Sequence, residues 1–511
     1  MIMMLNFNRL NHITNADEWK QAYDEEIHKL DELYQEGERL YYKMYAEGIE
    51  SGRIAEIQRI KHELMTDLAI IQTLSSWKDS LREDPIWHRR LHVFLLRMRQ
   101  EALESHPELT KIQQRLQASL MDSTFMVDGK EYNLGSVHSN ILENPDRVFR
   151  RKLFLEAQKS GEENEDLFRS LVIKRNELAV SLGYSDYYHF KCSLKEVDMD
   201  SYLGEMNALL ERTKTVSTQW EKRIKEKFGW DTLHYYDQYF STFHFHQIQN
   251  DSFHSNRMKE VLGDVVDSLG KSIDEMPISI ESLDIPYGGF CLNINPNELK
   301  LVVSKRNSYS AFLSGIHELG HAIDGHYASY KYPELYRFYS SIAAEGVAEL
   351  FQTIITDQAF LMKKFDLYEV DYVQMNEIQQ LMDLKMVRIN HYFSLVEYEL
   401  YQRPDRSFQE IANDCYTFVF GYEGEAGHPA NMMFYVENPA FFQDYNIALA
   451  MRDMIRHKFK IKSPYGNKDV FHELLTKFIE PNQLYSWKQR VEALCGESHT
   501  FAYLAERLSE E

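Results

Sequence analysis

Residues that break regular structure are scarce in this chain, and this scarcity most constrains its fold. The 511 residues include only 22 Gly and 12 Pro, the residues that most often interrupt helices and strands. Long uninterrupted elements follow, and apolar residues at helical spacing, such as Trp19, Tyr23 and Ile27, indicate that most of them are helices. We predict a mostly α fold, with helical stretches at 15–122, 145–182, 200–228 and 308 to the end, including one long helix near 370–402.

Local signals divide the helical pattern. Asn15 is a favourable N-cap, and Gly183 is placed to end a helix. Asp128-Gly129 supplies the positive φ angles of a type I′ turn, so residues 125–132 predict a hairpin. The β-branched and Gly-containing stretch 278–304 predicts a small sheet.

The charge balance excludes several classes of partner. Acidic residues outnumber basic ones by 79 to 57, which gives a net charge of −22. Such a surface repels phosphate backbones and anionic lipids, so we expect no binding to nucleic acid or to membranes. There is no long apolar run and no signal-peptide pattern, and the four cysteines have no CxxC spacing. We therefore expect a cytoplasmic protein with reduced thiols.

A metal-binding motif stands out in SGIHELGHAID, residues 314–324. On a helix, His317 and His321 lie one turn apart on the same face, where two imidazoles can bind one Zn²⁺. Glu318 is rotated away from that face and can accept a proton from a metal-activated water. The competing interpretation of the motif alone is a solvated helix that carries a histidine pair.

A third ligand is expected from the downstream helix in SSIAAEGVAELFQT, residues 340–353. Glu345 follows His321 by 24 residues, enough for a loop and a return helix. Two histidines and one glutamate leave a fourth position open, as a catalytic zinc site requires. Glu349, one turn further, is placed to accept the outer N–H of a ligand histidine, or is an ordinary surface carboxylate. The small residues around these acids predict close packing of the two helices.

A second histidine pair is a decoy. His244 and His246, in TFHFHQ, have strand spacing and could resemble a metal pair. No third ligand at a suitable spacing is evident, and aromatic neighbours indicate packing.

The motifs occur in a familiar order. HELGHA followed by AAEGVAEL resembles the oligoendopeptidase F and thimet oligopeptidase family of zinc peptidases. PYGGFCLNI at 286–294 and LVIKRNELAVSLGYSDYYHF at 171–190 resemble further segments of the oligoendopeptidase F branch. The resemblance runs from about 145 to 460, and the first 140 residues match only in being helical. We accordingly expect an N-terminal helical region at 1–145 and a catalytic region at 146–511, in lobes that interlock.

The resemblance implies a helical, two-lobed, zincin-like fold with one zinc ion at the bottom of a deep substrate channel. It also implies cleavage of short peptides rather than folded proteins. The strand Leu299–Ser304, with Leu301, Val302 and Val303, would then be the sheet edge along which an extended peptide lies. The alternative is a plain edge strand without substrate.

Family members also place a histidine and tyrosines downstream to hold the substrate carbonyl. In GHPANMMFYVENPAFFQDYNIALAM, residues 427–451, His428 is the candidate carbonyl or subsite ligand, and Tyr435 and Tyr445 are candidate donors to the oxyanion. The family's tyrosine cluster is partly replaced here by Phe441 and Phe442. A core role for either tyrosine is the alternative.

The predicted activity is hydrolysis of peptide bonds, with zinc held by His317, His321 and Glu345 and with Glu318 as general base and acid. A zinc carboxypeptidase or dipeptidyl carboxypeptidase on a related helical fold is the main alternative. A non-catalytic peptide-binding protein and a hydrolase of non-peptide amides also remain open. The sequence makes no prediction of the oligomeric state.

Overall fold

The computed structural model describes residues 5–246, 252–285, 288–365 and 367–510. The chain forms two compact units, each built from three separate segments. Residues 1–102, 249–367 and 451–499 make the first unit, and residues 103–248, 368–450 and 500–511 make the second. The sequence predicts a boundary near residue 145, but the first change of unit comes at Ala102 and Leu103.

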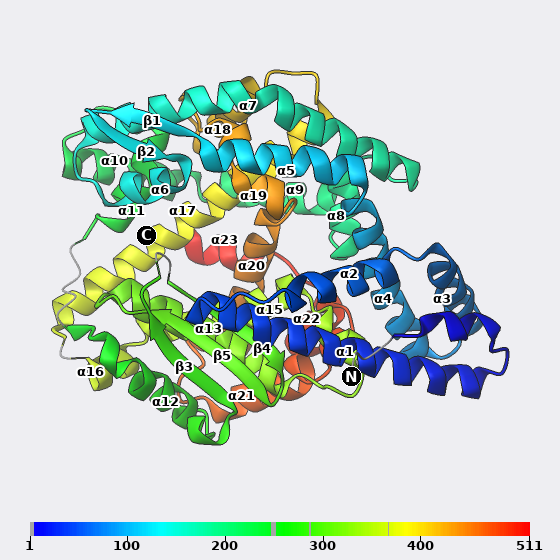
Figure 1. Ribbon diagram of the computed structural model, residues 1–511. Helices are drawn as coiled ribbons and strands as arrows, with labels where there is room; N and C mark the ends of the chain where they lie inside the picture. The colour runs from blue at the N-terminus through cyan, green and yellow to red at the C-terminus, as the bar shows by residue number, and fades with distance from the viewer. Residues whose placement is uncertain (1–4, 247–251, 286–287, 366, 511) are drawn as a thin grey trace. The chain divides into compact units, whose positions relative to one another are not determined.

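The first unit combines N-terminal helices with a small sheet and the helices that follow it (Figure 1). Its main elements are α1 (Ala16–Glu47), α2 (Arg53–Met65), α3 (Leu68–Ser80), α4 (Pro85–Glu104), α12 (Met258–Ser268), β3 (Ile278–Leu283), β4 (Gly289–Asn295), β5 (Glu298–Ser304), α13 (Tyr309–Tyr327), α14 (Pro333–Arg337), α15 (Ser341–Gln352), α16 (Gln358–Lys364), α21 (Lys468–Leu474) and α22 (Trp487–Cys495). The chain changes unit near the end of α4 and within α20 (Phe442–Phe459).

The second unit is almost entirely helical. Its main elements are α5 (Pro107–Asp122), β1 (Thr124–Val127), β2 (Lys130–Asn133), α6 (Leu134–Glu143), α7 (Arg147–Ser181), α8 (Tyr187–Leu194), α9 (Met199–Arg212), α10 (Lys214–Phe228), α11 (Gln238–Phe243), α17 (Glu369–Gln402), α18 (Phe408–Phe420), α19 (Met433–Glu437) and α23 (Ala502–Leu508). The mostly helical prediction is therefore confirmed, as is the long helix near 370–402.

The local signals act as predicted. The Asn15 side chain accepts a hydrogen bond from the Glu18 N–H and caps α1. Asp128 and Gly129 have φ angles of 51° and 80°, and they join the antiparallel strands β1 and β2. Gly183, with φ of 89°, follows the end of α7. All four cysteines are free thiols.

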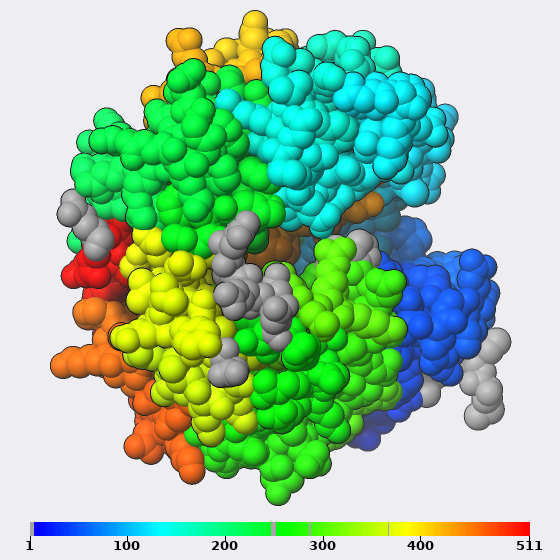
Figure 2. Space-filling view, turned by 90° about the vertical axis from the view of Figure 1, so that its left-hand side faces the viewer, coloured from blue at the N-terminus to red at the C-terminus, as the bar shows by residue number. Residues whose placement is uncertain are grey.

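Each unit has its own apolar core. In the first unit, Phe7 and the N-terminal helices bring Trp19, Tyr23, Leu74 and Phe94 into one cluster, and each of these four side chains is fully buried. Figure 2 shows the blue surface of these helices beside the yellow-green surface of the strand region, although the two are far apart in the chain. In the second unit, the hairpin and α7 pack around Leu153 and Phe154.

The three-stranded sheet has the order β3-β5-β4. β5 pairs parallel with β3 and antiparallel with β4, so it is the central strand. The prediction that Leu299–Ser304 is a free edge is therefore wrong, because both sides of its backbone already pair with neighbouring strands and Leu301, Val302 and Val303 are fully buried. The sequence could not show this, since two strands that flank a third in space need not flank it in the chain. Pro286 and Tyr287 of the segment before β4 lie outside the described residues.

No helix among the described residues combines the length and the apolar character needed to cross a membrane.

Candidate metal centre

The helix α13 carries the two histidines of the HExxH motif. Ser308 caps its N-terminus by accepting a hydrogen bond from the Ala311 N–H at 3.2 Å. Both imidazole rings project from the same face of the helix, with ring centroids 4.9 Å apart and planes at 81°. Two histidines in this arrangement can turn a nitrogen each toward one shared point.

Glu345 reaches the same point from α15. Its Oε2 atom lies 3.5 Å from Nε2 of His317 and 3.9 Å from Nε2 of His321. Among the described residues, His317, His321 and Glu345 are the group of three or more such side chains whose ligand atoms all lie close enough, within 4.8 Å, to hold a metal ion. The predicted convergence of the three side chains is thus present in the structure.

Small residues bring the two helices together. A Cβ atom on Gly320 of α13 would lie 2.6 Å from the Cα of Ala348 on α15. A Cβ on Gly346 would lie 2.3 Å from Sδ of Met451. Contacts under 3.0 Å require something to move, and at Gly320 the obstacle is backbone. The close packing expected from the small residues is therefore confirmed, and it sets the reach of Glu345.

The donor set fits zinc. Ligands at about 2.0–2.1 Å from a tetrahedral ion are about 3.3–3.4 Å from one another, and the two measured nitrogen–oxygen distances of 3.5 and 3.9 Å are near this value. The Glu345 Oε2 atom is buried and has no hydrogen-bond partner among the described residues. Buried polar atoms are rarely left without a partner, so this oxygen is well suited to bind a cation.

The charges at the centre are strongly coupled. Burial disfavours the charged imidazolium of His317, but Glu345, together with the charges of Glu349 and Glu318, outweighs burial and raises the pKa to about 9. Burial lowers the pKa of His321 to about 4, against the opposing charge of Glu345. Burial alone would raise the pKa of Glu345, but its contacts with the two histidines lower it. Glu345 is therefore a carboxylate at neutral pH, as a metal ligand must be.

Glu318 lies beside the ligands and faces β4. Burial raises its pKa to about 7, and the charge of Glu345 adds to the rise, whereas His317 and a hydrogen bond from the Cys291 backbone N–H oppose it. Gly289, on the same strand, leaves room for this side chain, since a Cβ there would lie 3.2 Å from Cγ of Glu318. A carboxyl group whose pKa is near neutrality can both accept and return a proton.

Glu349 has a different partner from the one expected. Its Oε2 accepts a hydrogen bond of 3.2 Å from Nη1 of Arg452, whose side chain is almost fully buried. Nδ1 of His317 has no hydrogen-bond partner among the described residues. His317 therefore does not donate its outer N–H to Glu349, and the carboxylate pairs with the buried guanidinium of Arg452 instead.

The candidate substrate ligands His428, Tyr435 and Tyr445 belong to the second unit. Two of them, His428 and Tyr435, form hydrogen bonds within that unit. His428 is 3% exposed. Its Nε2 lies 3.1 Å from Glu165, and its Nδ1 accepts a hydrogen bond from the Ala430 N–H. The hydroxyl of Tyr435, which is 2% exposed, donates to the Phe393 carbonyl at 2.8 Å. The polar atoms of both side chains have protein partners, which supports the core role for Tyr435, and the role of His428 stays a prediction.

Tyr445 is half-buried, and its ring packs edge-on against Phe441 at 5.3 Å. Its role stays a prediction. The decoy pair is held by packing, as expected. His244 stacks on Phe240 and contacts the Leu142 carbonyl, and His246 pairs with Glu377.

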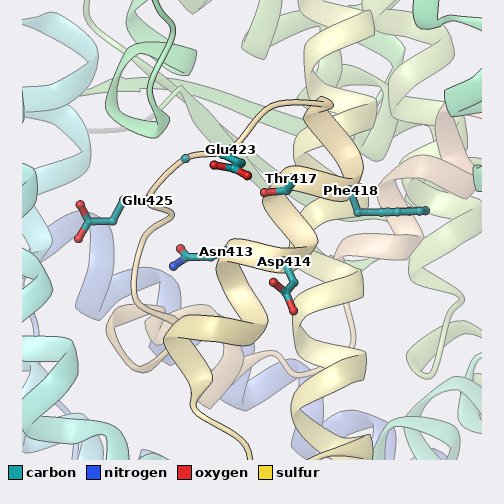
Figure 3. A pocket seen from close by; sticks show the side chains of 7 residues that line it. Asn413, Asp414, Thr417, Phe418, Glu423 and Glu425 are labelled. Atoms are coloured by element: carbon teal, nitrogen blue, oxygen red, sulfur yellow. The ribbon is translucent and has the colours of Figure 1, made fainter.

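A pocket of about 680 Å³ in the second unit lies between α18 and the loop after it. Figure 3 shows Asn413, Asp414 and Thr417 on the helix, and Glu423 and Glu425 on the loop, with Glu425 pointing away from the helix. Asn413 accepts from the Ala426 N–H, and Asp414 pairs with Arg406. The lining holds no histidine, so the pocket has no ligand set like that of the metal centre.

Sequence reasoning missed two side chains near the centre. Asn293 of β4 donates a 3.3 Å hydrogen bond to the His321 carbonyl, and Gly325 provides the space for it. Arg337 contacts the backbone carbonyls of Asn293 and Ile294. A glycine one turn after His321 was the only signal of the first contact, and no local pattern marks the second.

Known structures share this fold. A chain described as an oligoendopeptidase F has a TM-score of 0.70 at 13% sequence identity, with 99% of this chain and 94% of that chain covered. PZ peptidase A with an inhibitor has a TM-score of 0.71 at 14% identity, with coverage of 98% and 94%. A chain described as an oligoendopeptidase F from Bacillus anthracis has a TM-score of 0.65 at 15% identity, with coverage of 98% and 93%. No family model and no curated protein matches the sequence. Over nearly its whole length, the chain therefore has the fold of these oligoendopeptidase F and PZ peptidase A structures.

Proposed function

We propose that this protein is a zinc-dependent peptidase that hydrolyses short oligopeptides. The observation that carries the proposal is the meeting of His317, His321 and Glu345 within 4.8 Å, with Glu318 alongside. The shared fold with structures described as oligoendopeptidase F and PZ peptidase A supports it.

His317, His321 and Glu345 would hold the ion, which would supply a Lewis acid and an acidified water when bound. Glu318 accepts the proton of the attacking water on its carboxylate and returns it to the leaving amine. Its pKa of about 7 suits both transfers near neutral pH. Arg452 holds Glu349 one turn beyond Glu345 and so fixes this face of α15.

We assign the peptide-binding strand to β4 in place of β5. Among the described residues β4 pairs only with β5, so its other edge is open. The Ser304 N–H donates to the Gly288 carbonyl, which therefore points toward β5. Because strand residues alternate, the backbone groups of Gly289 and Cys291 point away from β5. The Cys291 N–H donates to Glu318. An extended peptide can pair with the backbone groups of Gly289 and with the Cys291 carbonyl, whatever its side chains are.

Substitution of the general base tests the mechanism. Glu318→Gln should bind zinc as the wild type does, because Glu318 is not a ligand, but its kcat should fall by roughly 10²–10⁴-fold. Metal content by atomic absorption and hydrolysis of a peptide with both ends blocked measure the two effects. Chelation should abolish wild-type hydrolysis, and zinc should restore it.

Two results would overturn the proposal. Full turnover by Glu318→Gln would remove this residue from the mechanism, and hydrolysis that resists complete zinc removal would remove the metal. Cleavage of peptides only when their C-terminus is free would instead support the carboxypeptidase alternative.

A further inference from the structure

The open edge of β4 ends abruptly at one side. The guanidinium of Arg337, at the end of α14, contacts two successive backbone carbonyls of this strand. Nη1 donates to Asn293 at 3.5 Å, and Nη2 donates to Ile294. Asn293 is two residues after Cys291, so its carbonyl belongs to the same outward-facing row. Arg337 therefore occupies the position where a paired peptide would continue.

Arg337 is firmly held in this position. Its Nε donates to Oδ1 of Asp31 on α1 at 2.5 Å, and the two side chains are only 7% and 4% exposed. Gln35, one turn later on α1, donates to Asp31 at 2.7 Å and accepts from the Asn295 side chain at 2.8 Å. A displaced guanidinium would leave a buried carboxylate without its ion-pair partner, which is costly.

Contacts close the far end of β4. Residues from Gly289 to Asn293 are partly exposed and Ile294 is fully buried, whereas Asn295 is partly exposed but its side chain donates to Gln35. The stretch open to a peptide thus begins beside Glu318 and stops where Arg337 contacts the Asn293 carbonyl. One two-residue strand period, about 6.6 Å, separates the outward groups of Cys291 from those of Asn293.

We propose that Arg337, fixed by Asp31, is an end stop that limits how far a substrate peptide extends along β4. The proposal rests on the peptidase function proposed above. With the scissile bond beside Glu318, the stop leaves room for about two residues on the blocked side. The protein then releases one short fragment of nearly constant length, and its substrates are peptides cleaved near one end.

A peptide ladder tests the stop on the unmodified protein. Zinc-loaded wild type is given blocked peptides that share one cleavable pair and grow by one residue at a time, at the N-terminal side in one series and at the C-terminal side in the other. In one series, kcat/KM should stop rising after about the second residue. A continued rise in both series overturns the proposal.

Variants assign the limit to Arg337. Arg337→Met combined with Asp31→Asn removes the guanidinium without leaving Asp31 charged and unpaired. For peptides two residues past the limit, kcat/KM should rise about fivefold, as expected for one added backbone hydrogen bond. Asp31→Asn alone is the matched control: the amide oxygen of the new side chain can still accept from Nε of Arg337, so the arginine should stay in place and keep the limit. A folded double variant with an unchanged limit overturns the proposal.

Two further outcomes are informative. If the double variant lacks a cooperative thermal transition, it is not folded and the wild-type peptide ladder alone tests the end stop: a plateau in one series supports it, and a continued rise in both overturns it. If zinc-loaded wild type hydrolyses no peptide, the peptidase proposal fails, and the same ladder is measured for binding by fluorescence anisotropy. A limit in affinity at one end supports the end stop, and its absence overturns it.

Discussion

At the scale of single residues, His391 of α17 shows how burial determines the charge of a side chain. It is fully buried, and neither ring nitrogen has a hydrogen-bond partner among the described residues. Its ring packs edge-on against Tyr202 at 5.8 Å. Burial, assisted by the charge of Arg388, lowers its pKa to about 3.

This residue should make the protein sensitive to acid. An unfolded histidine has a pKa near 6.5, so between pH 6.5 and 3 the unfolded chain binds a proton that the folded chain does not. The free energy of unfolding therefore falls as the pH falls. His391→Phe keeps an aromatic ring and should reduce the stability lost between pH 6.5 and 5 by about 2 kcal/mol. Urea denaturation at both pH values measures this.

The exposed His28 provides the control for loss of one histidine, as His28→Gln. An identical loss of stability in wild type and His391→Phe over this range would mean that another group causes the acid sensitivity.

Residue-level prediction from sequence works where the chemistry is local. His317 and His321 are one helical turn apart, so their shared face follows from spacing alone. The partner of Glu349 could not be predicted in this way, because Arg452 lies 103 residues along the chain. A buried guanidinium leaves no periodic signal that marks its partner.

At the scale of elements, the distance between α13 and α15 decides whether three ligands can meet. Gly320 lies in close contact with the backbone of Ala348 on the other helix. The sequence predicted the close packing from small residues. It did not predict the order of the strands, because pairing between distant segments leaves no local pattern.

Gly320→Ala should push the helices apart. The backbone of Ala348 cannot rotate away as a side chain can, so the change should cost about 1–3 kcal/mol of stability and weaken zinc binding. Gly204→Ala on α9 is the matched control, since its Cβ meets nothing within 4 Å. That variant should gain up to about 1 kcal/mol from helix propensity. Thermal melts and zinc titration compare the two, and normal zinc affinity in Gly320→Ala would contradict this account.

At the scale of the whole molecule, the chain crosses between the two units five times. The sequence predicts interlocked lobes with a boundary near residue 145, where the recognisable motifs begin, but the first change of unit comes at Ala102 and Leu103. Contacts within the first unit join its first and second segments. Arg90, for example, pairs with Glu334 at 2.5 Å, and both are 1% exposed.

Residues 146–511 should therefore not fold alone, although they contain every predicted catalytic residue. The truncated chain lacks the N-terminal helices that bury Trp19 and Tyr23, and it leaves Glu334 buried without its arginine, a change worth about 3–5 kcal/mol. Circular dichroism during heating should show no cooperative transition. A cooperative transition with bound zinc would show that the N-terminal helices are dispensable.

The alternation along β4 has a consequence for isotope labelling in heavy water. The amides of Phe290 and Leu292 face the central strand and should exchange their hydrogens slowly. The outward amide of Gly289 should exchange quickly, because no strand protects it. A bound peptide would slow that one amide and leave its neighbours as they are. Mass spectrometry of β4 fragments would thus report peptide binding at Gly289 in the inactive Glu318→Gln variant, where the peptide is not cleaved.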